Sequence, residues 1–560
     1  MFPSYKRILV FLVLFFLFGT SLAPLGVVAR ETSATLRSDS AATAITVPVV
    51  LKVRATGIAS TTNAALDLTL LGSYRPASEG SSEIVAYDPD AQQLYVTNGS
   101  SSRLDVLSIA NIATTFTPTL VSTIDLSPYG VGVTSVACKN GLVAAAVPAD
   151  PKTDNGTVVL VQGITTVALT VGALPDMLTF SPDGSKLLVA NEGEPNDDYT
   201  VDPEGSISII DVSGGIGGTD QADVTTLGFA AFNTPAVIDP GIRIYGPNAS
   251  VAQDLEPEYI ALSPDSTKAW VTLQENNAIA VVDLVGMQVT DLVALGTKDW
   301  SRLGLDPSDK DGGINLNNWE VLGLYEPDGI AAYNVRGTTY LVTANEGDTR
   351  DYDGYSEETR IGSLTLDPTR YPEAYAKAIQ DKAALGRLKT TTAVASGDTN
   401  LYTLGGRSFS IWNGSTGALV YDSGSDFERI TAAQIPELFN ADSGDPTLVD
   451  TRSDDKGPEP ESVVLGTIGQ RTYAFIALER SAGGVMIYDV TNPLAPTFVN
   501  YVPQAAGDVS PEGLAFISAE DSPTGKPLLI VAHELSGSTT VYEVSLGVVH
   551  YTVALPLLGK

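Results

Sequence analysis

The chain has 560 residues, of which 43% are hydrophobic and 18% charged, and its formal net charge at pH 7 is −34. This composition excludes a disordered chain and indicates a folded protein with a large core. The negative charge repels phosphate backbones, so we expect no nucleic-acid partner, whereas cations are attracted. Cys138 is the only cysteine, which excludes an internal disulfide.

Residues 1–29 predict a secretory signal peptide. A Lys-Arg pair precedes the apolar run of residues 8–28, and a small-residue site ends at Ala29. The alternative is an uncleaved membrane anchor, because the run approaches the length that spans a bilayer. We expect export, cleavage close to Arg30, a polar segment over residues 30–63 and no membrane span after signal removal.

From about residue 64 the pattern is that of an all-β protein, with short apolar runs, turn residues between them and almost no helical periodicity. Units of three strands repeat, usually followed by a fourth strand. The eight units are residues 82–109, 134–163, 175–212, 257–284, 327–367, 385–414, 460–490 and 511–544.

Four-stranded units cover both of their faces when they are arranged radially, so the repeats predict a β-propeller over residues 64–546, followed by a tail at 547–560. We expect eight blades, with seven as the alternative because unit 385–414 is weakly patterned. The unassigned run at residues 65–75 is expected to be the outer strand of the last blade and to close the ring.

One helix is expected within residues 371–386, with Pro372 at its first position and Gly386 at its end. Two long insertions, at residues 228–256 and 296–325, are expected to lie over one face of the propeller.

Acidic residues recur at two places in the repeat. Five units begin with Pro-Asp or Pro-Glu, and the same five have a Glu at the end of their second strand, 16 to 22 residues later. The first set is Asp176, Glu258, Asp328, Glu461 and Glu512, and the second is Glu192, Glu275, Glu346, Glu479 and Glu534. Since the innermost strands of a propeller line its channel, we expect a ring of carboxylates there.

Like charges that converge in this way must take up protons or bind a cation. Oxygen ligands without His or Cys favour Ca²⁺, with Mg²⁺ as the alternative. The structural alternative is that each acid pairs with an Arg of the next blade or caps a backbone amide.

Two acidic segments are further candidates for a cation site, or else solvated loops. One offers Asp348, Asp351, Asp353 and Glu357, and the other offers Asp309, Asp311 and Asn315. Neither has the full spacing of an EF-hand loop.

Catalytic signatures are scarce. The chain has two histidines, of which His533 lies beside Glu534 and is a candidate general base or ligand. A hydrogen-bonded structural histidine is the favoured interpretation. There is no G-x-S-x-G motif and no phosphate-binding glycine loop.

Several long motifs between Leu66 and Val544 resemble one known family, the choice-of-anchor I domain proteins. These motifs include LLVANEGEPNDDY, EPEYIALSPDSTKAWVTLQENNAIAVVDL, YLVTANEGDTRDYDGYSEETRIGSLTLD, LYTLGGRSFSIW and GPEPESV. The family looks related to the mesenchyme-specific cell surface glycoproteins and belongs among the YVTN-type propellers. The resemblance implies a secreted domain carried on varied surface anchors, with no reaction established for the domain itself.

We therefore expect a secreted or cell-surface binding module that acts as a monomer and binds an extracellular surface polymer or protein. The competing hypothesis is a calcium-dependent phosphoesterase, because related modules are similar to parts of secreted phosphatases. Such an enzyme needs basic residues for the substrate phosphate. Candidates near the motifs are Arg350, Arg360, Arg407 and Arg480.

Overall fold

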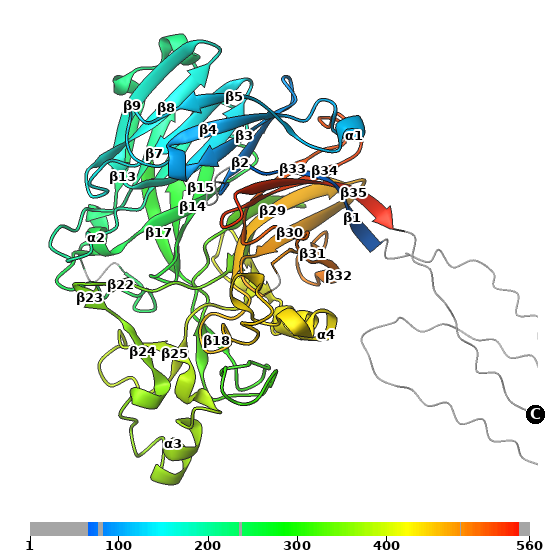
Figure 1. Cartoon of the computed structure of the whole chain (residues 1–560). Coiled ribbons are helices and arrows are strands. Elements are labelled where there is room, and N and C mark those ends of the chain that lie inside the picture. Colours follow the sequence, from blue (N-terminus) through cyan, green and yellow to red (C-terminus); the bar gives the residue numbers. More distant parts are fainter. Residues whose placement is uncertain (1–64, 77–81, 235–237, 482, 548–560) are drawn as a thin grey trace, which may run out of the picture. The chain divides into compact units, whose positions relative to one another are not determined.

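The structure, a computed structural model, describes residues 65–76, 82–234, 238–481 and 483–547 (Figure 1). The predicted signal peptide, the polar segment at 30–63 and the tail beyond residue 547 lie outside the described residues.

Seven four-stranded antiparallel sheets make up most of the described chain. The first sheet consists of β2 (Val85–Asp88), β3 (Gln93–Asn98), β4 (Arg103–Ser108) and β5 (Thr119–Asp125), and the second of β6 (Ser135–Lys139), β7 (Leu142–Val147), β8 (Asn155–Gln162) and β9 (Thr165–Ala173). The third sheet consists of β10 (Pro175–Phe180), β11 (Lys186–Asn191), β12 (Ser206–Asp211) and β13 (Val224–Gly228). The fourth consists of β14 (Pro257–Leu262), β15 (Lys268–Leu273), β16 (Ala278–Asp283) and β17 (Gln288–Ala294). The fifth sheet consists of β20 (Ile330–Val335), β21 (Thr338–Asn345), β27 (Ser408–Asn413) and β28 (Leu419–Asp422), and the sixth of β29 (Pro460–Ile468), β30 (Arg471–Leu478), β31 (Val485–Asp489) and β32 (Thr497–Val502). The seventh consists of β33 (Pro511–Ile517), β34 (Leu528–His533), β35 (Ser538–Gly547) and the N-terminal strand β1 (Ala65–Tyr74).

These sheets form a closed ring. The first strands β2, β6, β10, β14, β20, β29 and β33 contact one another in chain order, and β33 contacts β2. The N-terminal strand β1 pairs antiparallel with β35 and completes the last sheet. The predicted β-propeller is confirmed, together with its closure by an N-terminal strand.

The expectation of an eighth blade needs correction within the described residues. Residues 385–414 form no sheet of their own, because β27 in this unit pairs with β21 as the third strand of the fifth sheet. The rest of the unit pairs elsewhere, since β25 (Lys389–Thr391) joins β24 (Glu358–Arg360) and β26 (Tyr402–Thr403) joins β19 (Leu322–Leu324). Two expected units are therefore one blade, interrupted by a long insertion.

The core lies between neighbouring sheets. Strand β7 is buried at every residue, and its sequence LVAAAV places small side chains where sheets pack on both of its faces. The outer strand β5 is exposed along nearly its whole length. Ile207 of β12 and Val271 of β15 belong to one apolar cluster shared by two sheets. Each sheet thus covers its neighbours, as a radial arrangement requires.

The insertions carry the small elements. Strand β18 (Thr297–Asp299) pairs with β19, and β22 (Asp351–Tyr352) pairs with β23 (Tyr355–Ser356). The predicted helix is present as α3 (Glu373–Ile379), shorter than expected, with Pro372 as its N-cap. Figure 1 shows α3, β24, β25 and β18 gathered beneath the sheets.

Three other α-helices of the described chain were not predicted from the sequence: α1 (Ile112–Thr115), α2 (Val251–Asp254) and α4 (Asp426–Gln434). Within the described chain, no helix has the length and apolar character needed to cross a membrane.

Candidate metal centre

The ring of first strands surrounds a cavity of about 430 Å³. All ten acidic residues of the predicted repeat line it, together with Asp348 and Glu83. Among the described residues, only Lys456 and Arg480 bring positive charge to the lining. The carboxylate ring expected from the sequence is therefore present in one cavity.

A β-bulge at the start of the first strand positions the acid in four sheets. Pro175 pairs with Asn191, but the next pair is Met177 with Ala190, so Asp176 is an extra residue in its strand. The register shifts in the same way after Pro257, Pro460 and Pro511. Bulges redirect a side chain out of the regular alternation, and here the redirected side chain is a carboxylate that lines the cavity.

In four blades the backbone is strained at the residue before the proline of the Pro-Asp or Pro-Glu pair. Leu174, Glu326, Glu459 and Ser510 each precede the proline of a Pro-Asp or Pro-Glu pair and have φ values of 45°, 42°, 48° and 57°. Residues other than glycine rarely adopt this left-handed region, which costs about 1–3 kcal/mol per residue. The recurrence of this conformation at one place in four blades associates the strain with the placement of the acids.

In three blades the proline has an acidic residue on each side: a Glu before it, and a Glu or Asp after it. The two acids have different environments in the structure. Before the proline, Glu256, Glu326 and Glu459 are buried and paired with Arg350 at 3.1 Å, Arg243 at 2.8 Å and Arg452 at 2.6 Å. After the proline, Glu258, Asp328 and Glu461 have no ion pair within the described chain. Arginine pairing, which was the structural alternative for the ring acids, is thus found at the acid before the proline and not at these three ring acids of the described chain.

We call Glu192, Glu258 and Glu275 the first trio. One carboxylate oxygen from each lies within 4.8 Å of the others. Glu258 and Glu275 are 6% and 5% exposed, and the Oε2 atom of each is buried without a hydrogen-bond partner. In the described structure none of the three side chains forms an ion pair. Burial, then the neighbouring carboxylates, raise the pKa of all three well above the usual value.

We call Glu346, Glu461 and Glu479 the second trio, and their oxygens also lie within 4.8 Å of one another. Two cations approach this trio. Lys456 Nζ lies 2.6 Å from Oε1 of Glu346, and Arg480 Nη2 lies 2.8 Å from Oε1 of Glu479. Burial raises the pKa of Glu479 to about 8 despite these cations. The two trios therefore differ in charge compensation.

Glu83 is a member of the ring that the sequence analysis missed. It precedes β2 at the place taken by the acid in five of the other sheets, but Ser82 stands where those five have proline. Burial, followed by Glu534 and Asp176, raises the pKa of Glu83 to about 7. Aligning the units without requiring the proline would have identified this residue.

Of the two acidic segments that were candidates for a cation site, only one residue lines the cavity. Of the first segment, Asp348 lines the cavity, whereas Glu357 is buried against Arg243 and Asp351 and Asp353 are exposed outside the lining. In the second segment, Asp309 pairs with Arg387 at 2.9 Å, and neither Asp311 nor Asn315 lines the cavity.

The arginine candidates are engaged in ion pairs. Arg350 pairs with Asp254 at 2.8 Å, Arg360 with Asp454 at 2.9 Å and Arg407 with Glu428 at 2.7 Å.

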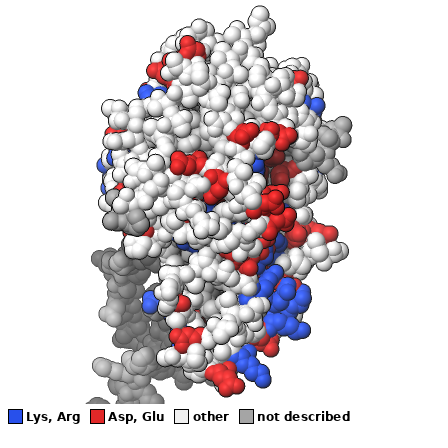
Figure 2. Space-filling model, turned by 90° about the vertical axis from the view of Figure 1, so that its left-hand side faces the viewer, with Lys and Arg blue, Asp and Glu red and all other residues white. Residues whose placement is uncertain are grey.

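Figure 2 shows a band of Asp and Glu side chains beside a group of Lys and Arg side chains on the face in view.

His533 lies in β34, is 1% exposed and has Nδ1 3.3 Å from the carbonyl oxygen of Ser538. Burial lowers its pKa to about 4, so the imidazole is neutral at physiological pH. It is absent from the cavity lining, which Glu534 joins. This placement fits a structural histidine.

Seven four-stranded sheets around an acidic cavity define a β-propeller with a candidate metal centre. The family model of the choice-of-anchor I domain matches residues 83–493, and the chain belongs to that family.

Two relatives cover parts of the chain. Gigasin-3a of Magallana gigas is 30% identical over 191 residues, which cover 30% of this chain and 67% of that protein. The mesenchyme-specific cell surface glycoprotein of Strongylocentrotus purpuratus is 27% identical over 311 residues, covering 46% of this chain and 39% of that protein. Among solved structures, the β-propeller domain of Cps50 (Swd1) from Myceliophteria thermophila has a TM-score of 0.42 and 8% identity, covering 86% of this chain and 100% of that one.

Proposed function

We propose that this protein is a secreted or cell-surface binding module that holds one Ca²⁺ ion at the first trio. The observation that carries the proposal is that Glu258 and Glu275 are buried and Glu192 is partly buried, while none of the three forms an ion pair among the described residues. An uncompensated buried carboxylate costs several kcal/mol. A bound cation removes that cost.

The geometry fits calcium. Calcium binds oxygen ligands at about 2.4 Å, so oxygens on opposite sides of one ion are roughly 4.8 Å apart. The oxygens of the first trio lie within 4.8 Å of one another. Magnesium binds closer and demands near-octahedral geometry, so it fits a set of three flexible glutamates less well.

A surface location and an extracellular ligand belong to the same proposal. The Strongylocentrotus purpuratus relative is by name a cell surface glycoprotein, and the first 29 residues of this chain have the pattern of a signal peptide. Calcium takes about six to eight oxygen ligands, so three glutamates leave positions for water or for oxygens of a ligand. We infer that a surface polymer or protein rich in oxygen donors binds there.

No specific observation favours the phosphoesterase alternative. Both basic residues of the described cavity lining, Lys456 and Arg480, are paired with glutamates. A phosphate group would have to displace a carboxylate from one of them.

Thermal unfolding with and without calcium tests the proposal. We expect EDTA to lower the melting temperature of the exported protein and added Ca²⁺ to restore it, because an ion bound only by the native state adds about 2.7 kcal/mol at a hundredfold excess over its Kd. Glu258→Gln should abolish this response. Glu512→Gln is the matched control, since Glu512 has the same place in its blade but belongs to neither trio.

If the melting temperature of the parent protein changes with neither EDTA nor calcium, the metal assignment is contradicted. Equal loss of the response in both variants would instead indicate diffuse attraction of cations to the acidic cavity.

A further inference from the structure

The two trios occupy equivalent places in the propeller, two blades apart. In each trio, one Glu follows the second strand of one blade, and the other two belong to the start of the first strand and the end of the second strand of the next blade. The first trio spans the sheets of β10 and β14, and the second spans those of β20 and β29. Backbone position alone therefore offers two similar cation sites in one cavity.

Lys456 distinguishes the second site from the first. Its Nζ lies 2.6 Å from Glu346, 3.8 Å from Asp348 and 3.9 Å from Glu459. Burial favours the neutral amine, but these three carboxylates outweigh burial and raise the pKa of Lys456 well above the usual value. The side chain is thus a fixed positive charge beside the second trio, whereas no basic side chain is paired with the first trio in the described chain.

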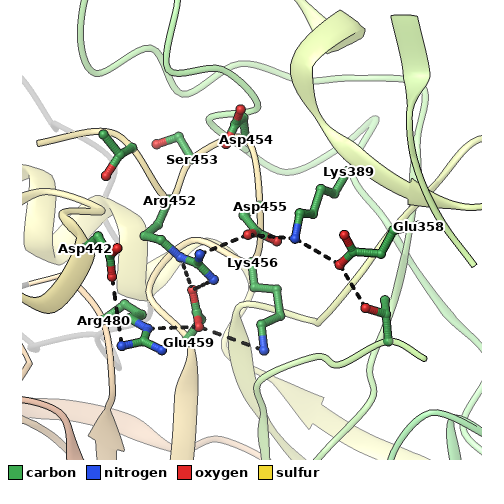
Figure 3. Close-up of polar contacts among 12 residues, drawn as sticks. Glu358, Lys389, Asp442, Arg452, Ser453, Asp454, Asp455, Lys456, Glu459 and Arg480 are labelled. Carbon is green, nitrogen blue, oxygen red and sulfur yellow. Dashed lines mark hydrogen bonds and ion pairs between the residues drawn. The ribbon is translucent and has the colours of Figure 1, made fainter. Parts of the chain in front are cut away.

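The segment that carries Lys456 is held in place by a network of ion pairs (Figure 3). Arg452 binds Glu459 at 2.6 Å and Asp455 at 2.9 Å, and Lys389 binds Asp455 at 3.2 Å. Gly457, with a φ of 71°, packs against the Arg407 guanidinium, where a Cβ atom would meet Nη1 at 2.8 Å. The ammonium is therefore positioned by the fold.

We propose that Lys456 takes the place of a divalent cation at the second trio, so that the cavity binds one Ca²⁺ ion rather than two. A divalent ion at this trio would lie close to the ammonium, and like charges in a low-dielectric cavity repel strongly. The inference rests on the proposed function, since it assumes an ion at the first trio.

The number of bound ions tests this inference. We expect equilibrium dialysis of the chelator-treated full chain against Ca²⁺ to give one ion for the parent protein and two for Lys456→Met, which keeps most of the length of the side chain and loses its charge. Lys456→Met combined with Glu461→Gln should return to one ion. Lys526→Met is the matched control, because Lys526 Nζ also lies 2.6 Å from a glutamate, Glu543, but outside the cavity. It should bind one ion.

The outcomes separate the two proposals. No bound ion in the parent overturns the proposed function. If the parent and a folded Lys456→Met variant each bind one ion, only the proposed role of Lys456 is overturned. Two ions in the parent would have the same consequence. If Lys456→Met does not fold, Glu461→Gln in the parent decides: we expect one ion with unchanged affinity, whereas loss of the ion would place it at the second trio.

Discussion

At the scale of single residues, one proline separates two glutamates with opposite environments. Glu256 is 1% exposed and pairs with Arg350, which in turn pairs with Asp254. Glu258, two positions later, is 6% exposed and has an unpartnered Oε2. The same residue type is thus a structural ion-pair partner on one side of Pro257 and a candidate metal ligand on the other.

This difference predicts opposite effects of the same substitution in metal-free protein at pH 8. Glu258→Gln should raise the free energy of unfolding, because the folded state no longer holds a carboxyl whose pKa burial raises, and each pKa unit is worth about 1.4 kcal/mol. Glu459→Gln, on the ion-paired side of Pro460, should lower the free energy of unfolding by about 1–3 kcal/mol, because Arg452 and Arg480 lose a charged partner. Urea denaturation in EDTA measures both. Effects of equal sign would contradict the division of roles.

At the scale of elements, the strands and their acidic positions could be predicted from the sequence because both recur with the period of the blade. The membership of β27 could not, because the insertion between β21 and β27 separates two strands that pair side by side. The contact of Lys456 with Glu346 could not be predicted either, since Lys456 comes from the loop before β29 and meets Glu346 of another blade only in the folded chain.

The N-terminal strand β1 offers a test of ring closure. Leu66 is fully buried in a cluster with Tyr473 and Phe475 of the preceding sheet, whereas Leu70 of the same strand is 48% exposed. Leu66→Ala should lower the free energy of unfolding by about 2–5 kcal/mol, as for other buried leucines. Leu70→Ala is the control and should change it by less than about 0.5 kcal/mol. Chemical denaturation showing equal small effects would mean that β1 adds little to the closed ring.

At the scale of the whole molecule, a chain with a net charge of −34 gathers twelve carboxylates in its central cavity. The fold opposes this repulsion in two ways: Lys456 and Arg480 pair with glutamates of the second trio, and burial raises the pKa of several other lining acids, which favours their protonated form. Burial raises the pKa of both Glu83 and Asp176 to about 7. Proton uptake and cation binding are therefore alternatives in this cavity.

This competition predicts a pH dependence for the metal-free protein. Glu83 and Asp176 keep their protons up to about pH 7 when folded but release them near pH 4 when unfolded. The stability they contribute is fully present below about pH 4 and is lost as the pH rises through 7, because the native state binds more protons than the unfolded state over that range. Thermal melts in EDTA should therefore show a lower melting temperature at pH 8 than at pH 5. The double variant Glu83→Gln with Asp176→Asn should make this slope shallower. That result would attribute the lost part of the slope to these two carboxyl groups and not to the net charge of the chain.

Calcium should oppose the same slope, because the ion stabilises the ionised carboxylates that protonation otherwise neutralises. The rise in melting temperature on adding Ca²⁺ should be larger at pH 8 than at pH 5, since protons compete less for the first trio. Glu258→Gln provides the control: it should show no calcium response at either pH, and it should make the metal-free slope shallower only by the contribution of this one carboxyl, whose pKa burial raises. A calcium effect that is larger at pH 5 would mean that the ion binds elsewhere than at carboxylates with raised pKa values.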